Sequence, residues 1–368
     1  MTVFAETEKQ TNRYLGGIMG HKLGIIGYGT MGSWHAANVR DRISDLDVAL
    51  VYDINEEKIK KAQAEGFTTC GSAQEIYESD VDIVLIATPN DFHKDYSIAA
   101  LNAGKNVVCE KPACMTVVEL EEVIAASKRN GKIYTVHQNR RWDIDYDIAR
   151  NILKQNLVGK PHQIYSRLYS NRNIPGDWRT IKSSGGGFLY DWGVHMIDQV
   201  LWMVDSKPVS VYAQLHHIYQ TEVDDAIRVN INFENGVCAH IVADSWTFVN
   251  ESRWHISGND GTARIDNWFG RTGKIIKANV KKVDWTQGCV YTHNGLSRSM
   301  WPRPESEVEE IPLPISEKEP RWEEFYENLM ATIEGKATQI VTHDEVRASL
   351  RVIEAAFESA EKCAVVKL

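Results

Sequence analysis

The 368-residue sequence lacks several features that would place it in particular classes of protein. It has no run of about 18 consecutive apolar residues, the length that a membrane helix needs, and its N-terminus has no charged segment followed by an apolar one. It also has no Lys/Arg-rich run, and its formal net charge is −9. We therefore expect a cytoplasmic protein that binds neither membranes nor nucleic acid.

Six cysteines are scattered along the chain without a C-x-x-C pair. A chain of this length does not depend on disulfides, so we expect free thiols in a reducing compartment and no metal site. Hydrophobic residues make up 43% of the sequence and charged residues 25%, which is typical of globular proteins. Because the chain exceeds the usual size of a single core, we expect two domains.

Residues 21–138 show short apolar runs alternating with helical segments of about ten residues. The apolar runs are "KLGIIG", "DVALVYD", "VDIVLIAT" and "KNVVCEKP". Continuous apolar strands between helices are typical of a parallel sheet covered on both faces. The pattern predicts an α/β fold that begins with a doubly wound, Rossmann-type domain over residues 21–138.

The pattern changes in the second part of the chain, which we assign to a domain over residues 139–368. After about residue 160, segments such as "VSVYAQLHH" and "AIRVNINFENGVCAHIV" are rich in β-branched residues, with hairpin sequences between them. They predict a large, open, mainly antiparallel sheet. Helices expected over 187–204 and 321–334 can cover one face of it, and we expect loops and irregular strands over 269–320.

A glycine-rich motif joins the first predicted strand to the first predicted helix. It consists of Gly27, Tyr28, Gly29, Thr30, Met31 and Gly32, and Asp53 closes the next strand 26 residues after Gly27. Glycines at these positions let the backbone approach a pyrophosphate at a helix N-terminus, and the later carboxylate binds the adenosine ribose. The motif predicts a dinucleotide site.

Asp53 also favours NAD over NADP. A carboxylate would repel a 2′-phosphate, and the residues that follow, Ile54 and Asn55, supply no arginine to receive one. Lys58 and Lys60 lie further on and leave NADP as the alternative.

Two further segments follow strands at the edge where ligands of such sheets bind. "TPNDFH" supplies Thr88, Pro89, Asn90 and His93, which we expect beside the nicotinamide half of the cofactor. "EKP" places Lys111 over the reacting centre. In the second domain, "GGGFLYDWGVHMID" contains Asp191 and His195, which share one face of a helix at this spacing and can meet.

These motifs, together with "HQNRRW", resemble the glucose-fructose oxidoreductase, inositol dehydrogenase and rhizopine catabolism family of NAD(P)-dependent sugar and polyol oxidoreductases. The resemblance runs from about residue 21 to the end. It implies a homo-oligomer formed through the open sheet face, and it assigns catalysis to Lys111, Asp191 and His195. The residues expected to bind the cofactor are Gly27, Tyr28, Gly29, Thr30, Met31, Gly32, Asp53, Ile54, Thr88, Pro89, Asn90, His93, Glu110, Lys111 and Asn139.

Oxidising a secondary alcohol needs a base within hydrogen-bond reach of the hydroxyl. His195 is the best candidate for this base, with Asp191 orienting it, and Lys111 is the alternative if burial lowers its pKa. Eleven tryptophans, among them Trp142, Trp178, Trp192 and Trp246, include flat faces suited to a sugar ring. The residues expected to bind substrate are Lys111, Arg141, Trp142, Asn171, Trp178, Arg179, Asp191 and His195.

We therefore predict an NAD-dependent dehydrogenase that oxidises a secondary ring hydroxyl of a sugar or glycoside, with C3 of a glucoside as one such position. The alternatives are an inositol dehydrogenase, a glycosidase that uses transient NAD-dependent oxidation, and a nicotinamide-binding regulator without turnover. Residues 1–20 form an N-terminal arm. Its apolar residues suggest that it covers the adenosine end of the cofactor, whereas a disordered tail is the simpler interpretation. These apolar residues are Phe4, Tyr14, Leu15, Ile18 and Met19.

Overall fold

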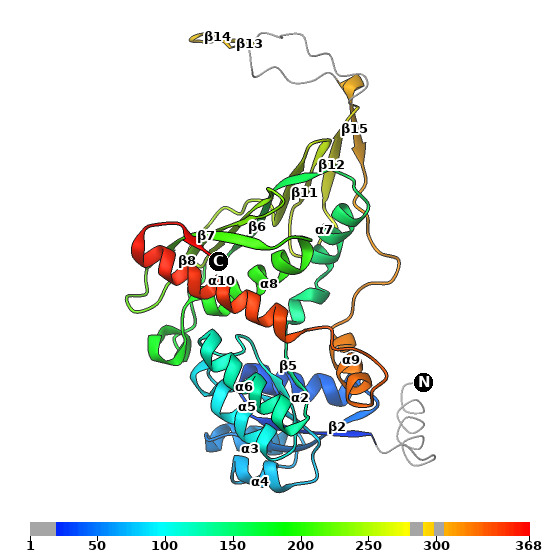
Figure 1. Ribbon diagram of the computed structural model, residues 1–368, viewed down its shortest axis with the longest axis vertical. Coiled ribbons are helices and arrows are strands. Elements are labelled where there is room, and N and C mark those ends of the chain that lie inside the picture. Colours follow the sequence, from blue (N-terminus) through cyan, green and yellow to red (C-terminus); the bar gives the residue numbers. More distant parts are fainter. Residues whose placement is uncertain (1–19, 280–289, 298–304) are drawn as a thin grey trace.

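The computed structural model describes residues 20–279, 290–297 and 305–368. The N-terminal arm and its five apolar residues lie outside the described residues except for Gly20, and so does part of the predicted irregular segment. Two domains are present, one above the other in Figure 1, as the sequence predicts. The cysteines among the described residues are free thiols.

The first domain contains a five-stranded parallel sheet in the order β2-β1-β3-β4-β5, which confirms the Rossmann-type prediction. Three of the strands, β3, β4 and β5, are completely buried, because helices cover both faces of the sheet. The strands are β1 (His21–Ile26), β2 (Leu46–Tyr52), β3 (Ile83–Ile86), β4 (Asn106–Cys109) and β5 (Tyr134–Val136). The helices are α2 (Thr30–Arg42), α3 (Glu56–Ala64), α4 (Ala73–Glu78), η1 (Asn90–Phe92), α5 (His93–Asn102) and α6 (Val117–Asn130).

The second domain is built on a nine-stranded sheet in the order β15-β12-β11-β10-β6-β9-β8-β7-β16. Only the pairing of β6 with β9 is parallel among these strands, so the prediction of a mainly antiparallel sheet is confirmed. The strands are β6 (Pro161–Tyr169), β7 (Pro208–His216), β8 (Ala226–Phe233), β9 (Cys238–Asp244), β10 (Trp254–Gly258), β11 (Gly261–Ile265), β12 (Gly273–Ala278), β15 (Val308–Ile311) and β16 (Val366–Lys367). A separate hairpin is formed by β13 (Val290–Thr292) and β14 (Gly295–Ser297).

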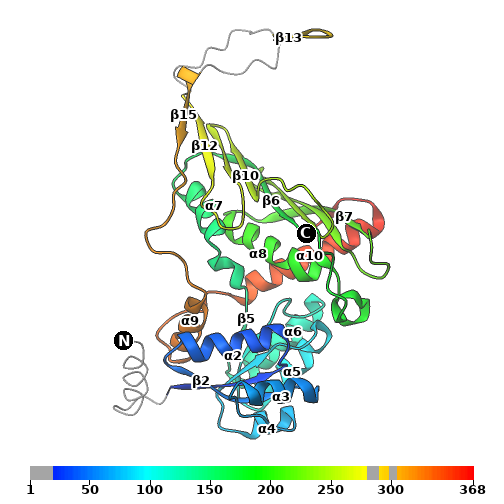
Figure 2. The same ribbon diagram turned by 180° about the vertical axis from the view of Figure 1, so that it is seen from behind.

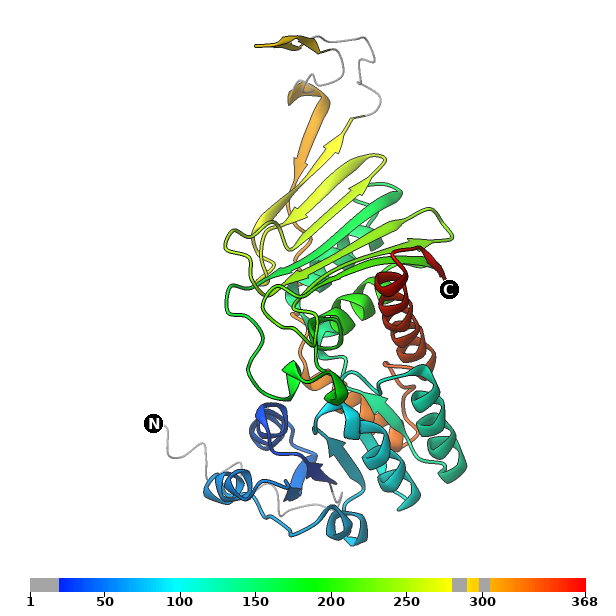
Figure 3. The same cartoon turned by 90° about the vertical axis from the view of Figure 1, so that its left-hand side faces the viewer.

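The long helices of this domain lie on the side of the large sheet that faces the first domain (Figure 3). The other face carries no helix in the part of the chain that the structure describes. These helices are α7 (Ile144–Lys154), α8 (Val194–Met203) and α10 (His343–Lys362), whereas a further long helix, α9 (Glu323–Ile333), lies apart from the sheet. The short helical segments are η2 (Asn139–Trp142), η3 (Trp178–Thr180), η4 (Lys182–Ser184), η5 (Leu189–Gly193) and η6 (Glu305–Glu307).

Helix α9 belongs to the second half of the sequence but packs against the first domain, close to α2 (Figure 2). Tyr326 on α9 makes a buried hydrogen bond from its hydroxyl group to His35 Nδ1 at 2.7 Å. The rings of Trp322 and Trp34 lie 4.9 Å apart, edge to face. The linear boundary that we predicted at residue 138 therefore does not separate the two bodies completely, because the chain returns to the first one.

No helix in the described segments is both long enough and apolar enough to cross a membrane.

Candidate functional site

The glycine-rich turn leaves open space where a phosphate would approach. Gly27 adopts a φ of 94°, and a Cβ on Gly32 would lie 1.9 Å from the Gly27 carbonyl oxygen, so both positions require glycine. A Cβ on Gly29 would have only Lys58 Nζ, at 3.7 Å, within 4 Å among the described atoms. Gly27 and Gly32 therefore shape the turn, and Gly29 keeps the space above it free, as a dinucleotide site needs.

The N-terminus of α2 can receive an anion. Thr30 and Met31 open the helix, its N-cap residue Gly29 supplies no side-chain hydrogen bond, and its first turn contains no acidic residue. The free backbone N–H groups and the helix dipole therefore favour negative charge at this point. These residues fit the pyrophosphate of a dinucleotide.

Asp53 lies just beyond β2, where its carboxylate supports the turn. It accepts hydrogen bonds from the backbone N–H of Tyr28 at 2.6 Å and of Asn55 at 2.8 Å, and Lys58 Nζ lies 3.8 Å away. The side chain of Ile54 is 87% exposed beside it. Asp53 thus stands where the ribose is expected, while the nearby Lys58 keeps a phosphate-binding alternative open.

Tyr28 and His93 do not have the ligand roles that we expected. The Tyr28 N–H group donates to Asp53, and its hydroxyl group donates a hydrogen bond to Glu65. His93 is fully buried, with Nδ1 2.7 Å from the Pro112 carbonyl oxygen and Nε2 3.0 Å from the Thr88 carbonyl oxygen. Both ring nitrogens are occupied, so His93 fixes the loops after β3 and β4 and leaves no nitrogen for a cofactor.

Asn90 is also used inside the protein. Its side-chain amide donates to the carbonyl oxygen of Gly185 at 2.8 Å and so ties the first domain to the glycine-rich loop before η5. Thr88 has a buried hydroxyl without a hydrogen-bond partner among the described residues, and Pro89 follows it. Thr88 is therefore the residue of this segment with a polar group left for a ligand.

Lys111 and Asp191 meet as the sequence suggests. Lys111 Nζ donates to Asp191 Oδ1 at 2.9 Å and to the Asp191 carbonyl oxygen at 2.8 Å. Arg179 Nε lies 3.7 Å from the same Asp191 oxygen. Burial alone would raise the pKa of Asp191, but the positive charges of Lys111 and Arg179 hold it below its usual value. Asp191 is thus an anion that fixes two cations.

Asp191 and His195 do not meet as we expected. Asp191 lies in η5, which is a π-helical turn, and such a turn widens the spacing that would place residues i and i+4 one above the other. No hydrogen bond or ion pair joins the two side chains in the described structure. The ring of His195 lies 6.0 Å from that of Trp192 instead.

His195 is 6% exposed, and its Nδ1 has no hydrogen-bond partner among the described residues. Burial, followed by the positive charges of Lys111 and Arg140, lowers the pKa of His195 well below its usual 6.5. The imidazole is therefore neutral at neutral pH and can accept a proton. No described group fixes which nitrogen of His195 carries the proton, so a bound ligand would determine the tautomer.

Glu110, the neighbour of Lys111, lies in a closed cluster. Its Oε1 atom accepts from His35 Nε2 at 2.8 Å and from His137 Nδ1 at 2.9 Å, and its Oε2 atom accepts from the Lys111 N–H at 3.2 Å. Burial acts to raise the pKa of Glu110, but the hydrogen bonds from His137 and His35 hold it well below its usual value. These contacts give Glu110 a positioning role and leave it no free oxygen for the predicted cofactor contact.

The His35, Glu110 and His137 side chains also lie close enough together for a metal ion, since their potential ligand atoms are within 4.8 Å of one another. The short hydrogen bonds to Glu110 account for this arrangement without a metal.

Two adjacent arginines differ in what they contact. Arg141, which we expected at the substrate, is buried and bidentate to Asp198 at 2.8 and 2.6 Å, and it also donates to Glu345 at 3.1 Å. It is a structural cation, and its predicted substrate role is not supported. Arg140 lies with its guanidinium over Trp192 at 5.0 Å and over Trp268 at 4.9 Å, and its Nε has no hydrogen-bond partner among the described residues.

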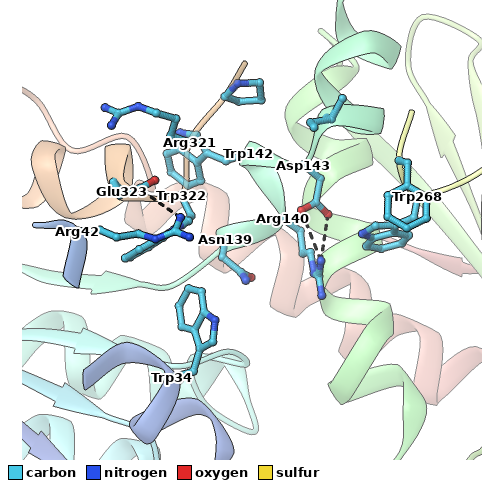
Figure 4. Close-up of a pocket in the computed structure, with 13 residues that line it drawn as sticks. Trp34, Arg42, Asn139, Arg140, Trp142, Asp143, Trp268, Arg321, Trp322 and Glu323 are labelled. Atoms are coloured by element: carbon cyan, nitrogen blue, oxygen red, sulfur yellow. Dashed lines mark hydrogen bonds and ion pairs between the residues drawn. The ribbon is translucent and has the colours of Figure 1, made fainter. Parts of the chain in front are cut away.

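Arg140 lines a cavity of about 500 Å³ between the two domains (Figure 4). Two predicted residues, Asn139 and Trp142, also line it. The remaining predicted substrate residues, Asn171, Trp178 and Arg179, are not part of its lining; Asn171 is exposed and Trp178 stacks on Arg179 at 4.6 Å. Sequence reasoning missed Trp34, Arg140, Trp268 and Trp322. The abundance of tryptophan in the sequence was the one available signal, but it does not tell which tryptophans line the cavity.

Two family models match the chain. The oxidoreductase family with an NAD-binding Rossmann fold matches residues 21–138, and the GFO/IDH/MocA C-terminal domain matches residues 146–264. An NAD-binding protein from Listeria innocua has a similar structure, with a TM-score of 0.90 and 38% sequence identity over 95% of this chain and 100% of that one.

Among curated relatives, inositol 2-dehydrogenase from Salmonella typhimurium is 29% identical over 72% of this chain and 80% of its own length. A scyllo-inositol 2-dehydrogenase (NADP(+)) from Bacillus subtilis is 24% identical over 93% and 94% of the two chains. An aldose-aldose oxidoreductase from Caulobacter crescentus shares the fold, with a TM-score of 0.75 and 23% identity over 95% of this chain and all of the other. With both domains matched and the cofactor crevice in place, the chain belongs to the GFO/IDH/MocA family of NAD-binding oxidoreductases.

Proposed function

We propose that the protein oxidises a secondary ring hydroxyl of a sugar or glycoside, with His195 as the base. The observation that carries this proposal is a neutral, buried imidazole with an unpartnered Nδ1, placed near a lysine that is paired with a carboxylate. A hydroxyl group entering between them finds a proton acceptor on one side and a cation on the other.

The cofactor is expected to bind through Gly29, Thr30, Met31 and Asp53. When bound, NAD supplies the acceptor for the hydride. The chain's own residues deal with the proton and the charge: His195 takes the hydroxyl proton, and Lys111 Nζ stabilises the charge that develops on the oxygen. Asp191 holds Lys111 in place through its 2.9 Å contact.

The contacts of Lys111 favour His195 as the base over Lys111. Lys111 Nζ donates to two oxygen atoms of Asp191, so two of its hydrogens are engaged by protein acceptors. His195 Nδ1, by contrast, has no hydrogen-bond partner among the described residues, and a neutral imidazole offers one nitrogen lone pair that can accept a proton. The imidazolium formed during the reaction would lie near Lys111 and Arg140, and the buried Glu110 carboxylate is the negative charge that acts on it.

A second candidate substrate is a cyclitol, which is favoured by the names of the inositol dehydrogenases that match the chain. A panel containing glucose, methyl β-D-glucopyranoside, myo-inositol and scyllo-inositol distinguishes the two when NADH absorbance and products are measured. Oxidation of the sugars supports the first proposal, whereas oxidation of the inositols alone replaces it with the second.

Two other outcomes of the panel would contradict both candidates. Release of free glucose from the glucoside without net NADH indicates a glycosidase with transient oxidation. Unchanged absorbance with every compound, while NAD still binds, indicates a regulator without turnover.

We also propose that the uncovered face of the large sheet joins copies of the chain. Tyr165 on β6 and His240 on β9 stack on that face with ring centroids 4.4 Å apart, while the alternate residues Ile164 and Ile241 are buried against the helices. Light scattering coupled to gel filtration should show an oligomer, which Tyr165→Glu should weaken. A monomeric wild-type protein would contradict this proposal.

A further inference from the structure

Four tryptophans from distant parts of the sequence face one cavity. Trp34 comes from α2, Trp142 from η2, Trp268 from the loop between β11 and β12, and Trp322 from the residue preceding α9 (Figure 4). All four are only partly buried, unlike the core tryptophan Trp254, which is fully buried. Aromatic surface left open in a concave site by four separate segments indicates a binding site rather than a core.

The cavity lies next to the proposed catalytic groups. Arg140 in its wall contacts both Trp268 and Trp192, and the rings of these tryptophans lie 5.7 Å apart. Trp192 directly follows Asp191, and its ring lies 6.0 Å from His195. A ligand that reaches His195 with one part can therefore place another part among the tryptophans.

The charges around the cavity favour a neutral ligand. Arg42 lies 3.4 Å from Glu323, Arg321 donates to Glu327 at 2.9 Å, and Arg140 Nη1 lies 3.4 Å from both oxygens of Asp143. The acidic neighbours of Arg42 and Arg321 weaken the attraction for a phosphorylated or acidic sugar. Burial raises the pKa of Asp143 to about 7, so Asp143 compensates Arg140 only in part at neutral pH. The long contacts of Nη1 to Asp143 leave Arg140 with hydrogen-bond capacity for hydroxyl groups.

We propose that this cavity binds a second ring attached to the sugar that is oxidised, so that the substrate is a glycoside with a cyclic aglycone or a disaccharide. The inference rests on the proposed function and names the part of the substrate that does not react. The volume of the cavity, about 500 Å³, lies within the range of about 300–1,000 Å³ that is typical of small-molecule pockets. Ring faces stack on the tryptophans, while Arg140 and Asp143 supply a donor and an acceptor.

Binding is measured on the full-length protein with NADH, which prevents oxidation, by calorimetric titration. The probes are phenyl β-D-glucopyranoside and methyl β-D-glucopyranoside, which differ only in the group that the cavity would hold. We expect the phenyl glucoside to bind about tenfold more tightly, because stacking and burial of one ring contribute about 1.4 kcal/mol.

Trp268→Leu should remove most of that difference and leave the affinity for the methyl glucoside within about twofold, because leucine keeps apolar bulk without a stacking face. Trp34→Leu tests the opposite wall if the first variant does not fold. Trp246→Leu is the matched control, since Trp246 is also partly buried in an aromatic cluster, with Tyr219 and Phe248, but does not line the cavity.

Equal affinities of the two glucosides for the wild-type protein, or no binding of either, would overturn the inference. So would an unchanged preference in both folded variants, or an equal loss in Trp246→Leu. The proposed function is judged separately by the NADH panel with monosaccharides, and it survives these results if a free sugar is oxidised.

Discussion

Glu110 and Lys111 are neighbours in the chain, yet their surroundings are built in opposite ways. Both oxygens of Glu110 are used by protein groups, from His35, His137 and the backbone. The Lys111 side of the site contains His195, whose Nδ1 has no partner among the described residues. Within the Glu110 cluster His137 Nε2 has no partner among the described residues, but the carboxylate itself is held by three donors and serves as a scaffold; beside Lys111 it is the imidazole of the proposed base that is left open to a ligand. The comparison teaches that burial and titratable groups alone do not identify a catalytic centre.

The largest expected effect is a loss of turnover when His195 or Lys111 is replaced. His195→Ala and Lys111→Ala should each lower kcat by about 100-fold or more, because they remove the proton acceptor and the cation near the oxygen. The midpoint of thermal unfolding should change little in His195→Ala, and NAD should still bind to both variants in a fluorescence titration. Near-normal turnover of both variants would contradict the assignment.

Replacement of Glu110 should lower the stability of the fold before it affects catalysis. Glu110→Ala leaves two buried histidines without their acceptor, so the free energy of unfolding should fall by about 3 kcal/mol. Urea denaturation of this variant beside His195→Ala measures the contrast. An unfolding free energy equal to that of the wild type would mean that the cluster is not a scaffold.

The same cluster predicts how stability depends on pH. Burial, followed by the charge on His137, lowers the pKa of His35 to about 4. In the unfolded chain His35 takes up a proton near pH 6.5, so stability falls as the pH is lowered from 6.5 towards 4, by about 3 kcal/mol for this group.

The variant His35→Gln keeps a donor for Glu110 and removes this titration. Its unfolding free energy, measured in urea at several pH values, should therefore fall less steeply below pH 6.5 than that of the wild type. His93 and His195 contribute to both proteins equally, so the difference between the two slopes reports on His35. Identical slopes would show that folding does not lower the pKa of His35.

Asp53 is intermediate between the two cases, because it accepts two backbone hydrogen bonds and still stands at the predicted ribose position. Asp53→Ala should weaken NAD binding by about tenfold and narrow the preference for NAD over NADP, since repulsion of a 2′-phosphate is relieved. Titration of both cofactors measures the ratio. A preference that stays the same would assign the selection to another group, with Lys58 the nearest alternative.

Much of the architecture could be predicted because it depends on periodic patterns and on glycines with a local requirement. The alternation of apolar runs with helices identified the parallel sheet, and Gly27 and Gly32 are required by the backbone itself. The pairing of Lys111 with Asp191 follows from motifs at strand and helix ends. These features are encoded within short segments or in the fixed geometry of the fold.

The remaining features depend on contacts between distant segments, which sequence patterns do not contain. Nothing in "NRRW" tells that Arg141 is bound by Asp198 and Glu345 while Arg140 is left between two tryptophans. The π-helical turn at η5 changes the direction of Asp191 relative to His195 without a recognisable sequence signal. His93 was misassigned because both of its partners are backbone carbonyls, which every sequence supplies.

The return of α9 to the first domain has a mechanical consequence. The chain passes between the two bodies three times, after β5, before α9 and again between α9 and α10, so they are linked by more than one tether. Two bodies joined at a single point can swing freely, whereas several separated tethers remove most directions of rotation. The two bodies are therefore less free to separate than bodies joined by a single linker, and the tryptophan cavity, whose walls include α2, η2 and the residue before α9, is lined from both sides of these connections.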